Sequence, residues 1–355
     1  MSRVETSERL GGVSDEGNLA VSGVIAEVLR QDMTPYRRSS RWRGALEVLI
    51  TATPLAACWG LACLAVHFRF WWGLVLVVPA TLFLLRMFMI QHDCGHGAFL
   101  PDKKANDWLG RVIGVLTLTP YDYWRQAHAI HHATAGNLDR RTLGGVDTLT
   151  VAEFRALSPW GRLGYRLYRH PLIMFALGPV FVFVVQHRWP AGLTRAGWRP
   201  WVSTMATNLA IVLATGLVIW LIGIPAFLLI NVPMVLCAAA IGVWLFYVQH
   251  QFEETTWARH KDWNVREAAL SGSSHYDLPP ILRWFTANIG LHHVHHLSSR
   301  IPYYRLGEVL RDHPQMASMG RITLLDSLRS VPLALWDEQA GRLVSFRQAR
   351  AMAAA

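Results

Sequence analysis

The chain alternates long apolar stretches with polar segments that are rich in histidine. A helix needs about 20 predominantly apolar residues to cross a lipid bilayer. Five apolar stretches stand out, and they occupy approximately residues 46–66, 71–90, 172–185, 206–222 and 225–248. This pattern predicts an all-α integral membrane protein.

The third stretch differs from the others. Residues 172–185 follow Pro171 and are too few to span a bilayer as a helix, so we predict that they lie in the interface or re-enter the membrane. The fourth and fifth stretches then form a hairpin. About four transmembrane helices result, and they place both termini and every histidine-rich segment on one side of the membrane.

Composition and charge support this interpretation. Hydrophobic residues make up 52% of the chain and charged residues only 16%, against about 25% charged residues in soluble domains. The net charge is +10, and arginines such as Arg37, Arg38 and Arg41 flank the apolar stretches. Positive flanks indicate the cytoplasmic side, so we expect both termini and the histidine-rich segments to face the cytoplasm, and we expect no nucleic-acid partner.

Three parts are predicted along the chain. Residues 1–40 form a polar N-terminal arm without the apolar core of a signal peptide. Residues 41–315 form a membrane-embedded catalytic domain with the spans, interfacial helices and a cytosolic helical cap that carries the histidines. Residues 316–355 form a C-terminal cytosolic tail.

Ten of the sixteen histidines fall into four groups. The groups read His92-Asp93-Cys94-Gly95-His96, His128-Ala129-Ile130-His131-His132, Gln249-His250-Gln251 and His292-His293-Val294-His295-His296. On a helix, positions i, i+3 and i+4 lie on one face. The spacing therefore predicts that the following nine imidazoles bind metal: His92, His96, His128, His131, His132, His250, His292, His295 and His296.

Nine imidazoles are more than one metal ion takes, so they suit two ions. Imidazole binds iron, zinc and copper alike, and the spacing alone leaves the metal open. His293 points away from its neighbours' face and is expected to support the ligands rather than to bind metal. An isolated histidine such as His170 is expected to be structural.

These residues resemble the membrane fatty acid desaturases, most closely the acyl-lipid Δ12-type branch of bacteria and plastids. The first two histidine groups resemble the H-D-C-G-H and H-x-x-H-H boxes of that family. The second box continues into Asn137-Leu138-Asp139. Residues 274–306 resemble the segment around the third box of the family, and they include Tyr276-Asp277-Leu278-Pro279, Asn288-Ile289-Gly290 and Leu297-Ser298-Ser299-Arg300-Ile301-Pro302. The resemblance covers roughly residues 40–310.

The resemblance implies a site with two iron ions (Fe²⁺/Fe³⁺), held chiefly by histidines, which uses O2 as co-substrate. It implies hydrogen abstraction from a fatty acyl substrate, carried as a lipid, a thioester or a free acid. An external ferredoxin or cytochrome b5-like protein would supply the electrons. Hydrogen-bond support for the ligands is expected from Asp93, Asn137, Asp139, Asp277 and His293. An acyl tunnel is expected beside the boxes, with Trp124, Ile130, Trp244, Tyr247, Phe252, Trp284 and Phe285 as candidate wall residues.

Desaturation of a long-chain acyl lipid is the leading hypothesis, and four alternatives stay open. The same scaffold could decarboxylate free fatty acids oxidatively to terminal alkenes, or hydroxylate the chain. A membrane metal-binding or transport protein is the non-enzyme alternative, although transport sites usually lie near the bilayer midplane. A membrane zinc hydrolase is a further alternative. It would require a catalytic glutamate beside its zinc ligands, and the sequence has no His-Glu-x-x-His motif.

Overall fold

A computed structural model describes residues 15–141 and 144–352, with side chains from residue 23 onward. The chain divides into two compact units, Met1–Asp32 and Met33–Ala355. The described part of the first unit contains helix α1 (Asp15–Arg30). All other elements belong to the second unit. The predicted domain limits at residues 40 and 315 stay predictions.

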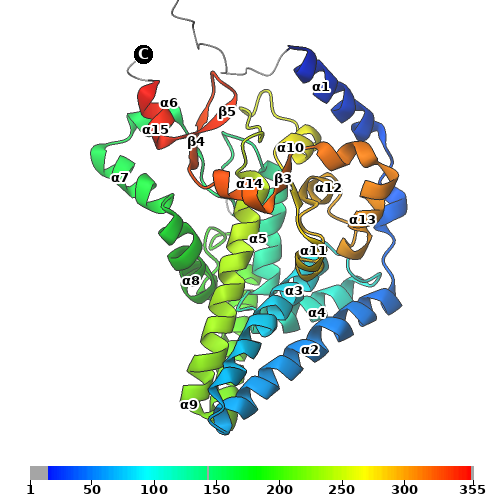
Figure 1. Cartoon of the computed structure of the whole chain (residues 1–355), viewed down its shortest axis with the longest axis vertical. Helices are drawn as coiled ribbons and strands as arrows, with labels where there is room; N and C mark the ends of the chain where they lie inside the picture. Colours follow the sequence, from blue (N-terminus) through cyan, green and yellow to red (C-terminus); the bar gives the residue numbers. More distant parts are fainter. Residues whose placement is uncertain (1–14, 142–143, 353–355) are drawn as a thin grey trace, which may run out of the picture. The chain divides into compact units, whose positions relative to one another are not determined.

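Three helical segments of the described chain are long and apolar enough to cross a membrane. They are α2 (Arg41–His67), the continuous pair η2 (Trp71–Leu76) and α3 (Val77–Gly95), and α9 (Trp198–His250). Figure 1 shows them side by side in the second unit. The predicted class, a mainly helical membrane protein, is confirmed.

Helix α9 is a hairpin of two helical segments. Its backbone leaves helical geometry at Gly223, where φ is 78° and ψ is 159°. Near one end, the Tyr123 amide of α5 (Tyr121–Thr134) donates to Ser203 Oγ, and at the other end His131 Nε2 lies 3.0 Å from His250 Nε2. A straight helix would separate positions 203 and 250 by about 70 Å, whereas positions 123 and 131 lie about 12 Å apart along α5. The chain therefore reverses at Gly223, as the sequence predicts.

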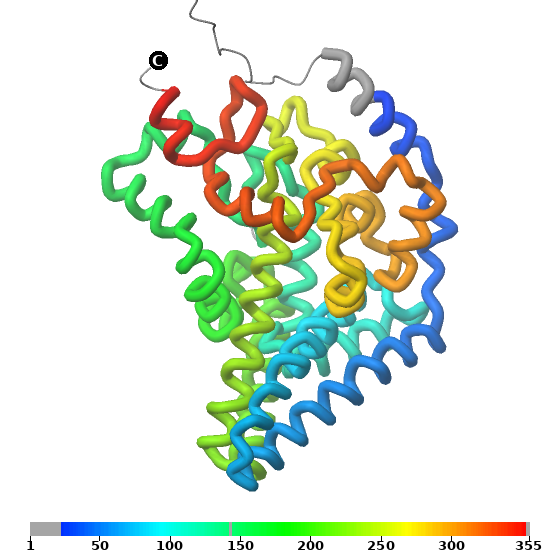
Figure 2. Tube along the Cα trace, in the orientation of Figure 1, coloured from blue at the N-terminus to red at the C-terminus, as the bar shows by residue number. Residues whose placement is uncertain are grey.

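Small and branched side chains join the spans. Ala80 and Leu84 of α3 pack against Met234 of α9, while Ala62 of α2 packs against Ala226 and Ile230 of α9. Small residues let membrane helices approach closely. Figure 2 shows the end of α2, the start of η2 and the bend of α9 close together.

The segment after α7 (Pro159–Tyr168) is bent. Residues Ile173–Arg188 lie at 59° to α7 and form the short turns η3 (Ile173–Leu177), α8 (Gly178–Val180), η4 (Phe181–Val185) and η5 (Gln186–Arg188). The turns η3 and η4 are π-helical, a form that is common at functional sites. The bend is compatible with a broken span or a re-entrant segment, and the predicted non-crossing placement stays a prediction.

The remaining elements of the second unit form a cap around the histidine-rich ends of the spans. Its helices and turns are η1 (Thr34–Arg37), α4 (Lys103–Leu116), α5, α6 (Val151–Ala156), α10 (Val265–Ser271), α11 (Pro280–Phe285), α12 (His292–Leu297), α13 (Tyr303–Asp312), η6 (Pro314–Ser318), α14 (Leu324–Arg329) and α15 (Phe346–Ala351). Strand β4 (Leu333–Asp337) pairs in parallel with β1 (Leu149–Thr150) and antiparallel with β5 (Arg342–Ser345). Strand β2 (His275–Asp277) pairs in parallel with β3 (Arg321–Thr323).

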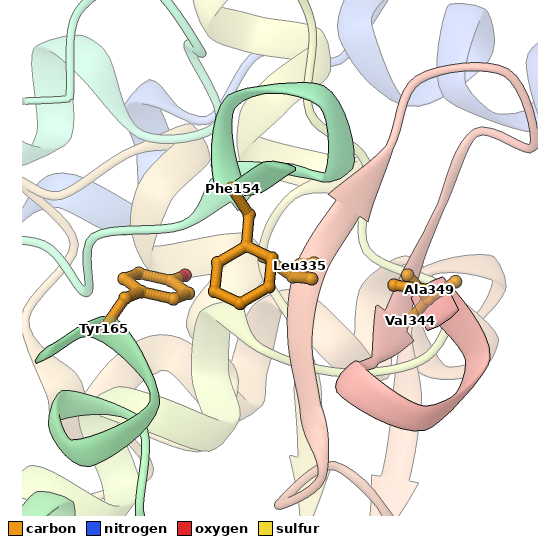
Figure 3. Close-up of a cluster of buried hydrophobic side chains, with 5 residues drawn as sticks. All are labelled: Phe154, Tyr165, Leu335, Val344 and Ala349. Atoms are coloured by element: carbon orange, nitrogen blue, oxygen red, sulfur yellow. The ribbon is translucent and has the colours of Figure 1, made fainter. Parts of the chain in front are cut away.

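The C-terminal strands pack against the segment that follows the second histidine group. Figure 3 shows Phe154 and Tyr165 beside Leu335, Val344 and Ala349, all of them buried. The Tyr165 hydroxyl also donates to the Ala334 carbonyl at 2.7 Å. Residues after 315 are therefore folded onto the preceding chain as far as the structure describes them.

Gly290 lies in close contact with the backbone of Tyr276, just before the fourth histidine group. A Cβ atom at Gly290 would lie 2.4 Å from the Tyr276 carbonyl oxygen, and the Tyr276 amide donates to the Gly290 carbonyl at 2.7 Å. Because backbone atoms cannot swing aside, we expect Gly290→Ala to destabilise the fold by about 1–3 kcal/mol. Thermal unfolding in detergent measures the change.

The matched control is Gly307→Ala in α13, where no atom lies within 4 Å of the added Cβ. Alanine is the better helix former, so this variant should be as stable as the unsubstituted protein or more stable. Equal effects of the two substitutions would contradict the role assigned to Gly290.

Candidate metal centre

Four helices bring the predicted ligands together. Helix α3 carries His92 and is followed at once by His96, and the last residue of α9 is His250. Helices α5 and α12 carry the two triads. The spanning helices α3 and α9 carry their histidines at the ends where the apolar pattern stops. The cap supplies the remaining histidines to the same place.

All nine predicted imidazoles converge, and they do so in two clusters. The first cluster contains His92, His96, His128, His132 and His295, and the second contains His131, His250, His292 and His296. Within each cluster the candidate ligand atoms lie within 4.8 Å of one another. This arrangement fits a site for two metal ions.

Each triad contributes to both clusters, which the shared-face prediction did not anticipate. His128 and His132 point into the first cluster, while His131 of the same helix points into the second. Positions i and i+4 are offset by about 40° around a helix and position i+3 by about 60° the other way. The pair at i and i+4 therefore meets one cluster and the residue at i+3 meets the other.

The spacing of the nitrogen atoms suits metal ligands. His128 Nε2 lies 3.0 Å from His92 Nε2 and 3.1 Å from His132 Nε2. Two nitrogens bound at about 2.1 Å and at right angles to one ion lie about 3.0 Å apart. A single imidazole nitrogen cannot satisfy two nitrogen neighbours by ordinary hydrogen bonds, because it either donates or accepts. Metal binding accounts for the convergence better than hydrogen bonding does.

Two further observations agree with ligation. The Nε2 atoms of His96 and His296 are buried and have no hydrogen-bond partner among the described residues. Burial, reinforced by repulsion between neighbouring imidazoles, lowers the pKa of His128, His132 and His296 well below the usual value. These rings are therefore neutral near pH 7, and neutral imidazole is the form that binds metal.

Some of the clustered histidines have a hydrogen-bond partner on the ring nitrogen that faces away from the cluster. Asp93 Oδ1 lies 3.2 Å from His92 Nδ1, and the Gly272 carbonyl oxygen lies 3.0 Å from His250 Nδ1. A partner on the second ring nitrogen fixes the tautomer and the ring orientation of a metal-binding histidine. Asp93 thus lies where the sequence places a supporting acceptor.

The other predicted supporting residues contact different parts of the cap. Asn137 lies 3.1 Å from His260 Nδ1, and Asp139 accepts from Arg259 at 2.8 Å. Asp277 accepts from Arg321 at 2.6 Å, and the His293 ring lies 3.0 Å from the Met316 carbonyl oxygen. None of these contacts reaches a histidine of the two clusters, so a supporting role for these four residues stays a prediction.

An apolar cavity of about 370 Å³ opens beside the clusters. His92, His128 and His292 line it, and it continues between α3 and α9 along Leu85 and Gly242. Among the seven aromatic and aliphatic wall residues considered from sequence, only Trp124 lines this cavity. The residues that do line the cavity come mostly from helices whose mutual packing the sequence does not reveal.

Sequence reasoning missed a buried ion pair near the site. Glu47 of α2 and Arg86 of α3 are 1% and 2% exposed, and Arg86 Nη2 lies 2.6 Å from Glu47 Oε2. The available signal was a charged residue inside an apolar stretch, which in membrane proteins usually has a functional reason.

Comparison with known proteins gives a consistent result. The fatty acid desaturase family model matches residues 69–325. A fatty acid desaturase of Bacillus subtilis (strain 168) is 42% identical over 319 residues, which cover 90% of this chain and 90% of that protein. An sn-1 acyl-lipid omega-3 desaturase (ferredoxin) of Synechocystis is 29% identical over 262 residues, covering 70% and 69%. An endoplasmic-reticulum omega-3 fatty acid desaturase of Vigna radiata is 27% identical over 275 residues, covering 71% and 67%.

Proposed function

Because the chain belongs to the fatty acid desaturase family of di-iron, histidine-box oxidoreductases, we propose that it inserts a double bond into a long-chain acyl group of a membrane lipid. The observation that carries this proposal is the apolar cavity that leads from His92, His128 and His292 into the region between the spans. An acyl chain in this cavity would lie beside both histidine clusters. Placement in the Δ12-type branch stays a prediction.

We assign the nine clustered histidines as ligands of two iron ions. An unactivated C–H bond requires a redox metal, because acids and bases of the protein cannot cleave it. When bound, the iron ions would supply the activation of O2 and the hydrogen abstraction. The histidines hold the ions, and the low exposure of residues such as His131 and His292 keeps water from the reacting chain.

The balance of the reaction requires an electron donor. Removing two hydrogens from the chain while reducing O2 to two waters consumes two electrons and two protons from outside the substrate. The Synechocystis relative bears ferredoxin in its name. We infer that a ferredoxin or a cytochrome b5-like protein serves this chain from the cytoplasmic side of a bacterial inner membrane.

The cavity favours an esterified acyl chain over a free fatty acid. No lysine or arginine is found among the described residues that line it. Arg125 and Arg283 lie near the histidine groups in the sequence but do not line the cavity either, and Arg125 is paired with Asp107 at 2.6 Å. A buried carboxylate without a cationic partner is strongly unfavourable.

Lipid analysis tests the proposal. The protein and its His132→Ala variant are expressed in a bacterial host, and the lipids and headspace are compared by gas chromatography–mass spectrometry. We expect new unsaturated acyl chains only with the unsubstituted protein, and their fragmentation gives the bond position. A terminal alkene one carbon shorter than a host fatty acid, or a hydroxylated chain, would replace desaturation by decarboxylation or hydroxylation.

A further inference from the structure

The ion pair between Glu47 and Arg86 lies where charge is unfavourable, inside the apolar helices α2 and α3. Arg86 also donates to the Trp284 carbonyl oxygen, and its guanidinium carbon lies 4.0 Å from the centroid of the Trp284 ring. These contacts satisfy both charges. They do not by themselves explain why the membrane helix α3 carries an arginine. The hydrogen bond between Glu47 and Tyr303 supplies a reason.

Glu47 holds the first residue of α13 in place. The Tyr303 hydroxyl donates to Glu47 Oε2 at 3.0 Å, and the Arg86 guanidinium carbon lies 5.3 Å from the centroid of the Tyr303 ring. Tyr303 is 2% exposed, so the ring has little freedom to move. A contact between two spanning helices thereby fixes the N-terminal end of a helix in the cap.

That end of α13 is bonded to the support of a predicted ligand. The Tyr303 amide donates to Asp93 Oδ2 at 2.6 Å, and Asp93 Oδ1 lies 3.2 Å from His92 Nδ1. The partial positive charge at the N-terminus of a helix stabilises a carboxylate there. Asp93 can then accept from His92 Nδ1, which leaves His92 Nε2 directed at the first cluster.

We propose that Glu47, Arg86 and Tyr303 are positioning residues of the metal centre. Together they keep the Tyr303 amide on Asp93 and, through Asp93, hold the His92 imidazole in the orientation that binds metal. The inference rests on the proposed ligand role of His92. Because His92 belongs to only one of the two clusters, substitution of these positioning residues should affect one ion and not the other.

Iron release from the purified full-length protein tests this claim. The protein is loaded with Fe²⁺ without oxygen, and release to an excess of a coloured chelator is followed in time. We expect Tyr303→Phe and Glu47→Gln to accelerate release of one of the two ions about tenfold, the usual size of such indirect effects, and to leave the other ion unchanged. The matched control is Thr81→Val, because Thr81 is a buried residue of α3 whose hydroxyl donates to the Val77 carbonyl of the same helix.

A second variant guards against misfolding. Glu47→Leu combined with Arg86→Met removes both buried charges. Arg43, whose Nη2 lies 2.7 Å from Glu47 Oε1, loses this partner, but its side chain is 52% exposed and stays solvated. The double variant should still show faster release of one ion. Unchanged release in Tyr303→Phe and in the double variant would overturn the inference, and so would equal acceleration of both ions. The His92→Ala variant separates the two proposals, because retention of both ions with ordinary kinetics would remove the ligand assignment itself.

Discussion

The His132→Ala variant should lose double-bond formation by more than about a hundredfold and should bind less iron, because a ligand contributes more than the residues that support it. His132 Nε2 lies 3.1 Å from His128 Nε2 and 3.2 Å from His295 Nε2, at the centre of the first cluster. Alanine leaves that cluster without one of its five imidazoles. Iron per protein and product per cell are measured on the same preparations.

The same substitution at His296 removes a member of the second cluster and should have a similar effect. The matched control is His170→Ala. His170 is exposed, and its ring nitrogen Nδ1 accepts from the Leu172 amide rather than facing either cluster. Full activity of His132→Ala or His296→Ala would refute the ligand assignment, and loss of iron from His170→Ala would show that the site extends further than proposed.

The convergence of the nine histidines could be anticipated from the sequence because their spacing is a local property. A helix places residues four apart on one face, so a pair such as His92 and His96 is recognisable without knowledge of the fold. The assignment of each histidine to one cluster is not local. It depends on how α5 and α12 face each other, which follows from the packing of the cap onto the spans and has no signal in either segment.

The membrane architecture was also largely predictable. The turn at Gly223 lies between two apolar stretches and is followed by Pro225, so the hairpin of α9 could be anticipated. The ion pair between Glu47 and Arg86 was overlooked in the sequence because each residue lies within a stretch that is apolar on average. Their partners, Tyr303 and Trp284, lie far along the chain, and only the folded structure brings them together.

A substitution inside the cavity should abolish activity without removing iron, which would separate substrate binding from metal binding. Gly242 lines the cavity and lies two helical turns, about 12 Å along α9, before His250. A Cβ atom there would lie 3.9 Å from Leu85 Cδ1, an ordinary contact, so Gly242→Ala should be tolerated. Phenylalanine would extend a ring across the space that the acyl chain is proposed to occupy.

We expect Gly242→Phe to lower product formation by more than about tenfold, since an occupied pocket excludes the chain that catalysis must position, while bound iron stays normal. The matched control is Gly216→Phe in the first segment of the α9 hairpin, where the glycine is exposed and no neighbouring atom lies within 4 Å of an added Cβ. Product analysis and iron content are measured for both variants. Ordinary activity of Gly242→Phe would place the acyl chain outside this cavity. Loss of iron from that variant would instead mean that the cavity wall and the metal centre cannot be altered independently, because the same α9 segment that forms the wall ends at His250.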